Sequence, residues 1–184
     1  MARDSSATKA RILAAAFDEF AAYGIAGARV DRIADTAGAN KRMIYVYYGN
    51  KEQLFDQVIL RAVEQGAESV PFDAGNLPRY AGAIFDHLTA DPRLVRLMMW
   101  KRLERPEATV LEAEAYARKT SALAEAQAEG RVAPAHAPAD LLTLVLGLAQ
   151  SWYTAAVGDA GTEEHRAAHR AAVVDAVTRL AEVR

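Results

Sequence analysis

Alanine restricts the fold of this chain more than any other feature, because 41 of its 184 residues are alanine. Alanine has the highest intrinsic helix propensity of the twenty residues. The segments between the 6 prolines and 11 glycines carry apolar residues every three or four positions, which is the spacing of the buried face of a helix. No run of alternating apolar residues is long enough to indicate a strand. The sequence therefore predicts an all-α protein.

The apolar periodicity predicts nine helices, and local signals mark several of their ends. Gly24 and Gly38 follow the first two helices, where a residue that tolerates positive φ is favoured. Asn40 is a suitable N-cap for the third helix, and a serine or threonine between residues 5 and 8 for the first. The expected helices span about residues 8–23, 30–37, 41–47, 51–68, 77–89, 93–103, 107–129, 139–157 and 162–183.

Missing residue types and motifs exclude several classes of protein. The chain has no cysteine, so disulfides and cysteine-based zinc sites are excluded. It has no phosphate-binding loop, nucleophile elbow or dinucleotide fingerprint, and we expect neither an enzyme nor a cofactor. The N-terminus has no apolar signal segment and the longest apolar stretch, residues 141–149, is too short to cross a bilayer. We therefore expect a soluble, cytoplasmic protein with no membrane partner.

Charge is divided unevenly along the chain. Residues 1–52 hold 8 Lys and Arg against 6 Asp and Glu (net +2), and residues 53–184 hold 14 against 18 (net −4). A basic segment attached to an acidic body favours a polyanion partner, although a random division of surface charge explains it equally well. Glu19 and Glu112 are expected on ordinary helix surfaces. His165 and His169 lie one helical turn apart, but an exposed helix face explains them better than a metal site, so no metal is expected.

The second and third helices have the outline of a helix-turn-helix, in which the second helix of the pair lies in the major groove of DNA. Ile44 and Tyr48 are its expected inward residues. The outer surface then carries basic and phenolic side chains, which suit phosphate oxygens and base edges, and a methionine, which suits thymine methyl groups. The alternative is that the cations are merely solvated and the tyrosines belong to the core. These surface residues, with the cation that opens the next helix, are Lys41, Arg42, Met43, Tyr45, Tyr47 and Lys51.

Three segments resemble the N-terminal domain of the TetR family of bacterial transcriptional regulators. They are ILAAAFDEFAAYG at the first helix, VDRIADTAGA at the second helix and turn, and NKRMIYVYYGNKEQLF from the third helix into the fourth. The aromatic cluster followed by Asn50, Lys51, Glu52 and Leu54 is the most diagnostic part. The resemblance covers about a quarter of the chain, and the order of the predicted helices also fits the family.

The resemblance implies a sequence-specific transcriptional repressor that binds double-stranded operator DNA as a dimer, at a palindromic site, and is released by a small-molecule effector. It implies a helix-turn-helix DNA-binding domain over residues 1–50 and a helical effector-binding and dimerisation domain over residues 51–184. The family usually has threonine where this chain has Arg29, which could replace a phosphate contact but not the N-cap. The implied DNA contacts are Arg29, Lys41, Arg42, Met43, Tyr45, Tyr47 and Lys51.

The helix at 139–157 is apolar on more than one side, and such a helix must be buried on all sides. In a chain of this size a second subunit most easily supplies the second cover. Two helices from each subunit would form a four-helix bundle with two-fold symmetry, an interface that the family resemblance also implies. The alternative is a core helix in a monomer. The expected interface residues are Leu142, Leu146, Ala149, Tyr153, Val173, Val177 and Leu180.

The middle helices hold large apolar residues with polar neighbours, which are typical of a pocket for a small apolar or amphipathic effector. The alternative is that these residues are ordinary core. The candidate pocket residues are Phe85, His87, Met98, Met99, Trp100, Arg102, Tyr116 and Trp152. The main alternative for the whole chain is a helical small-molecule-binding or interaction module that does not bind DNA.

Overall fold

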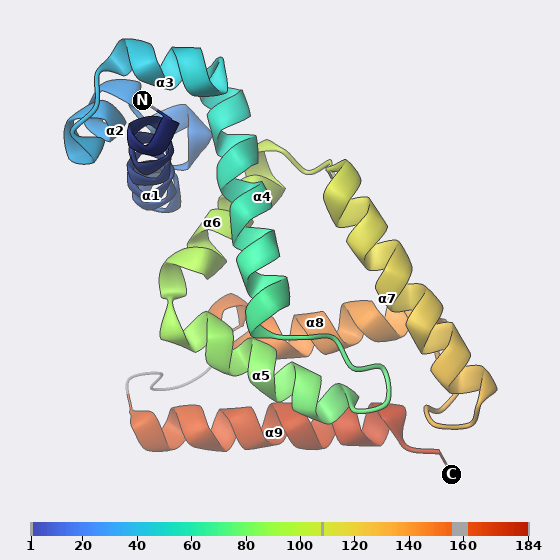
Figure 1. Cartoon of the computed structure of the whole chain (residues 1–184). Coiled ribbons are helices and arrows are strands. Elements are labelled where there is room, and N and C mark those ends of the chain that lie inside the picture. Colours follow the sequence, from blue (N-terminus) through green and yellow to red (C-terminus); the bar gives the residue numbers. More distant parts are fainter. Residues whose placement is uncertain (1, 108, 156–161, 184) are drawn as a thin grey trace. The chain divides into compact units, whose positions relative to one another are not determined.

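The computed structural model describes residues 2–107, 109–155 and 162–183, and within these ranges it contains nine helices and no strand (Figure 1). Most helix ends agree with the predicted ranges to within one turn. The predicted connector at residues 158–161 and the predicted end of the eighth helix at residues 156–157 lie outside the described residues. The helices are α1 (Ala2–Gly27), α2 (Val30–Ala37), α3 (Lys41–Tyr48), α4 (Lys51–Ser69), α5 (Leu77–Ala90), α6 (Pro92–Glu104), α7 (Val110–Ala128), α8 (Pro138–Thr154) and α9 (Glu163–Ala181).

The first helix begins earlier than predicted and is interrupted near its end. It starts at Ala2, so the prediction of an N-cap between residues 5 and 8 is wrong. Serine is only slightly less favourable than alanine inside a helix, which is why these residues do not stop it. At Gly24 the backbone has φ 66° and ψ −174°, and one further turn follows. The predicted stop at Gly24 is therefore confirmed as a break in the helix.

The helices pack into two compact units. The N-terminal unit consists of residues 1–65 and 92–107, and the C-terminal unit consists of residues 66–91 and 108–184. The N-terminal unit thus includes α6 and most of α4 in addition to the helix-turn-helix. These packing units differ from the predicted functional division at residue 50, which stays a prediction.

The core of the N-terminal unit joins α1, α2, α3, α4 and α6. The rings of Phe20 and Phe55 meet edge to face with their centroids 5.1 Å apart, a favoured geometry for aromatic pairs. Leu97 of α6 is fully buried in the same core. The predicted inward face of α4 is confirmed, and its buried residues are Leu54, Phe55, Val58, Ile59 and Ala62.

In the C-terminal unit α5 packs against α8 and α9, and α7 packs against α8 (Figure 1). Two pairs of side chains tie α5 to its neighbours. Arg170 of α9 donates two hydrogen bonds to Asp86 of α5, with distances of 2.6 and 2.7 Å. Phe85 of α5 is buried against Trp152 of α8, with ring centroids 6.3 Å apart. No helix in the described part of the chain is long and apolar enough to cross a membrane.

Candidate nucleic-acid interface

Short-range hydrogen bonds fix the turn between α2 and α3. Gly38 has φ 58° and ψ 41°, the left-handed conformation predicted for it. The backbone N–H of Ala39 donates to the carbonyl of Ala34 at 2.9 Å, which closes the end of α2. The side chain of Asn40 accepts a hydrogen bond from the backbone N–H of Arg42 at 2.8 Å, so the predicted N-cap is confirmed. Ile44 is buried and anchors α3 on the core. The axis of α3 is therefore held at its start and along its inner face.

The start of α2 is held by a residue from α1. Arg29 occupies the N-cap position, and its side chain makes no capping bond within the described chain. The carboxylate of Glu19 accepts instead from the backbone N–H of Arg29 at 2.8 Å and from Nε and Nη2 of Arg32 at 2.9 and 2.6 Å. Glu19 is only 9% exposed, so its predicted position on an ordinary helix surface is wrong. The Arg29 side chain is exposed and is not used for capping, so it is available for a contact with another molecule.

The outward face of α3 combines cationic, phenolic and apolar side chains. Lys41, Arg42 and Tyr45 are exposed, and Met43 is partly buried at the edge of this face. Val46, which the sequence analysis did not single out, is 65% exposed. A valine on the exposed side of a short helix is the signal that could have identified it. This face can form hydrogen bonds and a methyl contact within one major groove of DNA.

An acidic residue of α2 reaches the candidate face. Asp31 forms an ion pair with Lys41, with Oδ1 and Nζ 2.7 Å apart. The hydrogen bond between them raises the pKa of Lys41 and lowers the pKa of Asp31. The charge of Arg29 also lowers the pKa of Asp31, and it offsets part of the rise in the pKa of Lys41. Both side chains are exposed, and exposed ion pairs are weak. A phosphate could therefore replace Asp31 as the partner of Lys41 at little cost.

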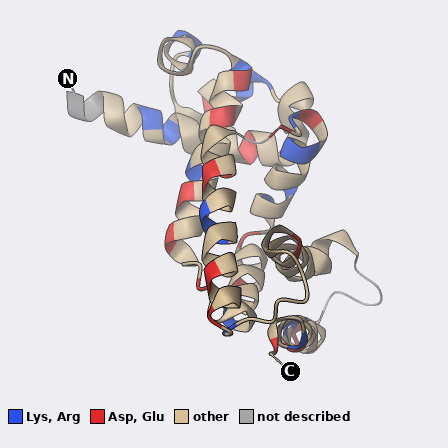
Figure 2. Ribbon diagram, turned by 90° about the vertical axis from the view of Figure 1, so that its right-hand side faces the viewer, with Lys and Arg blue, Asp and Glu red and all other residues tan. Residues whose placement is uncertain are grey.

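Two predicted contact residues also have partners inside the N-terminal unit. Lys51 donates from Nζ to the carbonyl of Ala28 at 3.3 Å, so it helps to hold the loop between α1 and α2. Tyr47 is partly buried, and the ammonium of Lys9 lies 5.1 Å from the centre of its ring. The phenol of Tyr48 donates to the carbonyl of Lys9 at 3.1 Å. Lys9 thus joins the candidate surface from α1, on which Figure 2 shows basic residues near the N-terminus.

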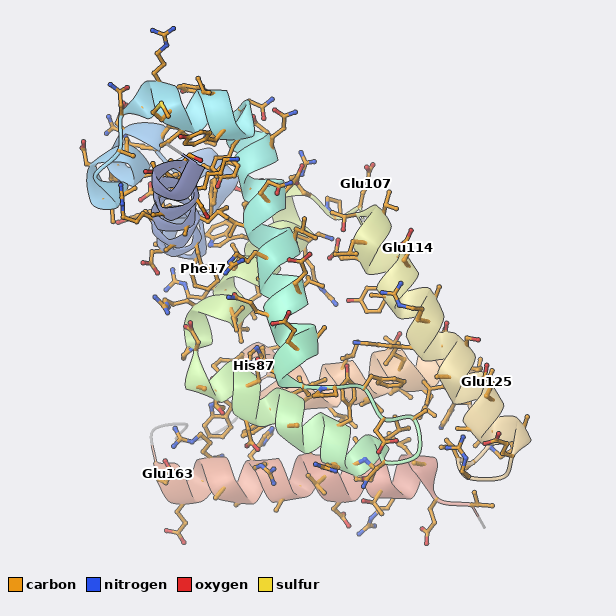
Figure 3. The ribbon with its side chains drawn as sticks, viewed as in Figure 1. Phe17, His87, Glu107, Glu114, Glu125 and Glu163 are labelled. Atoms are coloured by element: carbon orange, nitrogen blue, oxygen red, sulfur yellow. The ribbon has the colours of Figure 1, made fainter. Side chains whose placement is uncertain are left out.

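The predicted pocket residues are divided between the two units. Met98 packs against the N-terminal core, and the indole of Trp100 lies beside Gly24 in the same unit. In the C-terminal unit Phe85 contacts Trp152, whose ring lies between those of His165 and His169. The residues in the N-terminal unit are Met98, Met99, Trp100 and Arg102, and those in the C-terminal unit are Phe85, His87, Tyr116 and Trp152. Figure 3 labels His87 on α5. The described residues contain no group of three acidic or histidine side chains that could hold a metal.

Most of the predicted dimer residues pack inside the C-terminal unit. Four are buried in the core of that unit, and a contact of α8 and α9 with a partner stays a prediction. The four are Leu142, Ala149, Val173 and Val177. The other three are partly buried, and they are Leu146, Tyr153 and Leu180. A helix that is apolar on two sides can bury both sides within one chain when neighbouring helices surround it. The sequence does not show whether those neighbours belong to the same chain or to a partner.

Two family models match the sequence. The model of bacterial regulatory proteins of the tetR family matches residues 12–58. The model of the tetracyclin repressor-like C-terminal domain matches residues 76–179, which is more than half of the chain. Both models describe regulatory proteins, which agrees with the expectation that the chain is not an enzyme.

Individual relatives and solved structures agree with the family models. The HTH-type transcriptional repressor SCO4008 of Streptomyces coelicolor is 42% identical over 88% of this chain and 91% of its own length. The HTH-type transcriptional repressor NicS of Pseudomonas putida is 30% identical over 56% of this chain and 52% of its own. The crystal structure of SCO4942 from Streptomyces coelicolor has a TM-score of 0.85 at 39% identity and covers 96% of this chain and 99% of that chain. These similarities and the geometry of α2 and α3 show that the chain belongs to the TetR family of helix-turn-helix, DNA-binding transcriptional regulators.

Proposed function

We propose that this protein is a repressor that binds a palindromic operator as a homodimer and leaves it when a small-molecule effector binds. The outward face of α3 carries the proposal, because it presents exposed basic, phenolic and apolar groups on a helix whose position is fixed by Asn40, Ile44 and Gly38. A fixed, exposed helix of this composition suits direct reading of base edges in the major groove.

We infer two roles for the residues at this surface. Arg42 and Tyr45, with Val46 and Met43, face the groove and read base edges and thymine methyl groups. The surrounding cations and phenols contact phosphates and set the register of the helix. The phosphate contacts in this proposal are Lys9, Arg29, Lys41, Tyr47 and Lys51.

The dimer in this proposal uses the exposed sides of α8 and α9. Leu144 of α8 is 42% exposed, and a Cβ built at Gly147 would meet no atom within 4 Å. The exposed side of α9 carries small residues that allow a partner helix to approach closely. These are Ala167, Ala168, Ala171 and Ala172. Exposed apolar and small residues on two adjacent helices suit an isologous contact with a second copy.

Release by the effector requires the C-terminal unit to influence the spacing of the two α3 helices. Helix α4 belongs to both units, with Lys51–Gln65 in one and Gly66–Ser69 in the other, and it continues across the boundary without a break. A continuous helix can transmit a rotation from one unit to the other. A coupling free energy of about 2–3 kcal/mol would lower operator affinity roughly 30- to 150-fold.

The experiment compares DNA binding by matched charge variants of the full chain. The probe is a duplex enriched from a random library by the wild-type protein, and binding is followed by fluorescence anisotropy. The double variant Lys41→Ala and Arg42→Ala should lose the sequence-specific binding. Arg118→Ala removes an exposed cation of the C-terminal unit and should leave the affinity unchanged.

Two controls make the result decisive. Light scattering should show that the double variant is still a dimer, and circular dichroism should show that it is still folded. The logarithm of the wild-type affinity should fall steeply with the logarithm of the salt concentration, because phosphate contacts release counterions. Equal binding by the double variant and Arg118→Ala would contradict the proposed role of α3, and the failure of the wild type to enrich any duplex would favour a module that does not bind DNA.

A further inference from the structure

An ammonium group in the C-terminal unit lies close to two aromatic side chains. Lys119 lies on α7 between Glu114 and Glu125, which are labelled in Figure 3. Its Nζ donates a hydrogen bond to the phenol oxygen of Tyr80 at 2.8 Å. The same atom lies 5.7 Å from the ring centre of Phe72 and 5.4 Å from that of Tyr80. The cation therefore lies beside the Phe72 ring and at the hydroxyl end of Tyr80.

The Lys119 ammonium is partly buried without a counter-ion. No described carboxylate forms an ion pair with it. Burial lowers the pKa of Lys119, the nearby phenol of Tyr116 raises it, and the charge of Arg118 lowers it again, with a net downward shift. A downward shift means that the charged form is less favourable here than in water. A bound anion would offset that penalty, and a bound cation would increase it.

The cluster also has free donors and an apolar surface beside them. An ammonium has three N–H donors, and Tyr80 takes one of them. Tyr116 lies one turn before Lys119 on α7 and is 43% exposed, so it extends the aromatic surface outward. Two donors next to exposed and partly buried aromatic rings match a ligand that has an anionic group on an aromatic body.

We propose that Lys119, with Phe72, Tyr80 and Tyr116, anchors the effector, and that the effector is an organic anion such as an aromatic carboxylate or sulfonate. This inference rests on the proposed release of the protein from DNA by an effector. It narrows the expected small apolar or amphipathic effector to one chemical class. Of the four residues, only Tyr116 is predicted from the sequence as a pocket residue.

The test uses two fluorescent probes that differ in one charged group. 1-Anilinonaphthalene-8-sulfonate carries the sulfonate, and N-phenyl-1-naphthylamine has the same rings without it. The wild-type protein should prefer the anionic probe. Lys119→Met should lower the affinity for that probe about tenfold or more, as expected for the loss of a charge-assisted hydrogen bond, and should leave the neutral probe nearly unaffected. Lys119→Arg should keep the preference because it keeps the charge.

Arg118→Gln is the matched control, because it removes the neighbouring exposed cation and leaves the aromatic cluster intact. The inference is wrong if Lys119→Met keeps the wild-type preference, or if Arg118→Gln loses as much of it as Lys119→Met. Circular dichroism of each variant verifies the fold, and Lys119→Gln, which removes the charge but keeps a polar side chain, should lose the preference and decides the question if Lys119→Met is unfolded.

A second readout separates this inference from the proposed function. The sulfonate probe should lower the operator affinity of the wild type and leave that of Lys119→Met unchanged. If the probe binds through Lys119 and operator affinity does not change, the assignment of an effector site is wrong while DNA binding stands. If the wild type binds no enriched duplex at all, the proposed function fails whatever the probes do.

Discussion

Gly24 is the position where a single methyl group should disturb the N-terminal unit most. Its φ of 66° and ψ of −174° lie in a region that only glycine populates readily, and another residue there costs about 1–3 kcal/mol. A Cβ at this position would lie 2.8 Å from Cε3 of Trp100 and 2.9 Å from Oε1 of Glu104. Displacing a stiff indole by overpacking costs about 1–3 kcal/mol more. We therefore expect Gly24→Ala to lower the free energy of unfolding by about 2–6 kcal/mol.

Gly38→Ala is the matched comparison, because it substitutes a second glycine of positive φ in the same unit. Gly38 also has positive φ, but a Cβ there would meet no atom within 4 Å. Its substitution should cost only the left-handed strain, about 1–2 kcal/mol. Both variants belong to the same unit, so the difference between them reports the contacts with Trp100 and Glu104 together with the greater backbone strain at Gly24.

The assay is urea unfolding followed by tryptophan fluorescence. The chain has 2 tryptophans, and a Trp152→Phe background leaves Trp100 as the reporter of the N-terminal unit. Gly24→Ala should also change the emission of the folded state, because the indole has to move. If Gly24→Ala is no less stable than Gly38→Ala, or if the emission of Trp100 is unchanged, a Cβ at Gly24 does not displace the indole as we expect.

Three further predictions concern stability and assembly. Glu19→Gln should lower the thermal midpoint in circular dichroism more than Asp18→Asn, because Glu19 is buried between α1 and α2 whereas Asp18 forms an exposed ion pair. Burial raises the pKa of Tyr80 from 10.0 to about 12, so its titration should lower stability by up to about 3 kcal/mol between pH 10 and 12, and Tyr80→Phe should lose correspondingly less stability over this range in urea titrations. Leu144→Arg should shift the light-scattering mass from dimer to monomer, and an unchanged dimer would refute the proposed interface.

Local sequence patterns were sufficient to predict most of the helices and the helix-turn-helix. Gly38 and Asn40 act through bonds to residues within a few positions of them, and the periodicity around Ile44 directly reflects which side of α3 is buried. The same holds for the inward face of α4. Features that depend on neighbours close in sequence are accessible to this kind of reasoning.

Contacts between distant residues could not be predicted in this way. The carboxylate of Glu19 binds Arg29 and Arg32 because α1 and α2 pack together, and no spacing rule links those positions. The bond between Lys119 and Tyr80 likewise joins α7 to α5. Periodicity shows that a face is buried and does not show which element covers it, so the apolar rows of α8 and α9 predict burial without showing whether the same chain or a partner covers them.

Selection of duplexes from a random library by the purified full chain tests whether a symmetric dimer reads DNA through α3. We expect enrichment of an inverted repeat whose half-sites are separated by roughly 34 Å or more, because two α3 helices of a symmetric dimer would enter successive major grooves. We also expect that Arg42→Ala relaxes the preference at one position in each half-site. Two results would contradict DNA reading by a symmetric dimer through α3. One is a selection that enriches no sequence, and the other is an enriched asymmetric sequence whose selection does not change with Arg42→Ala.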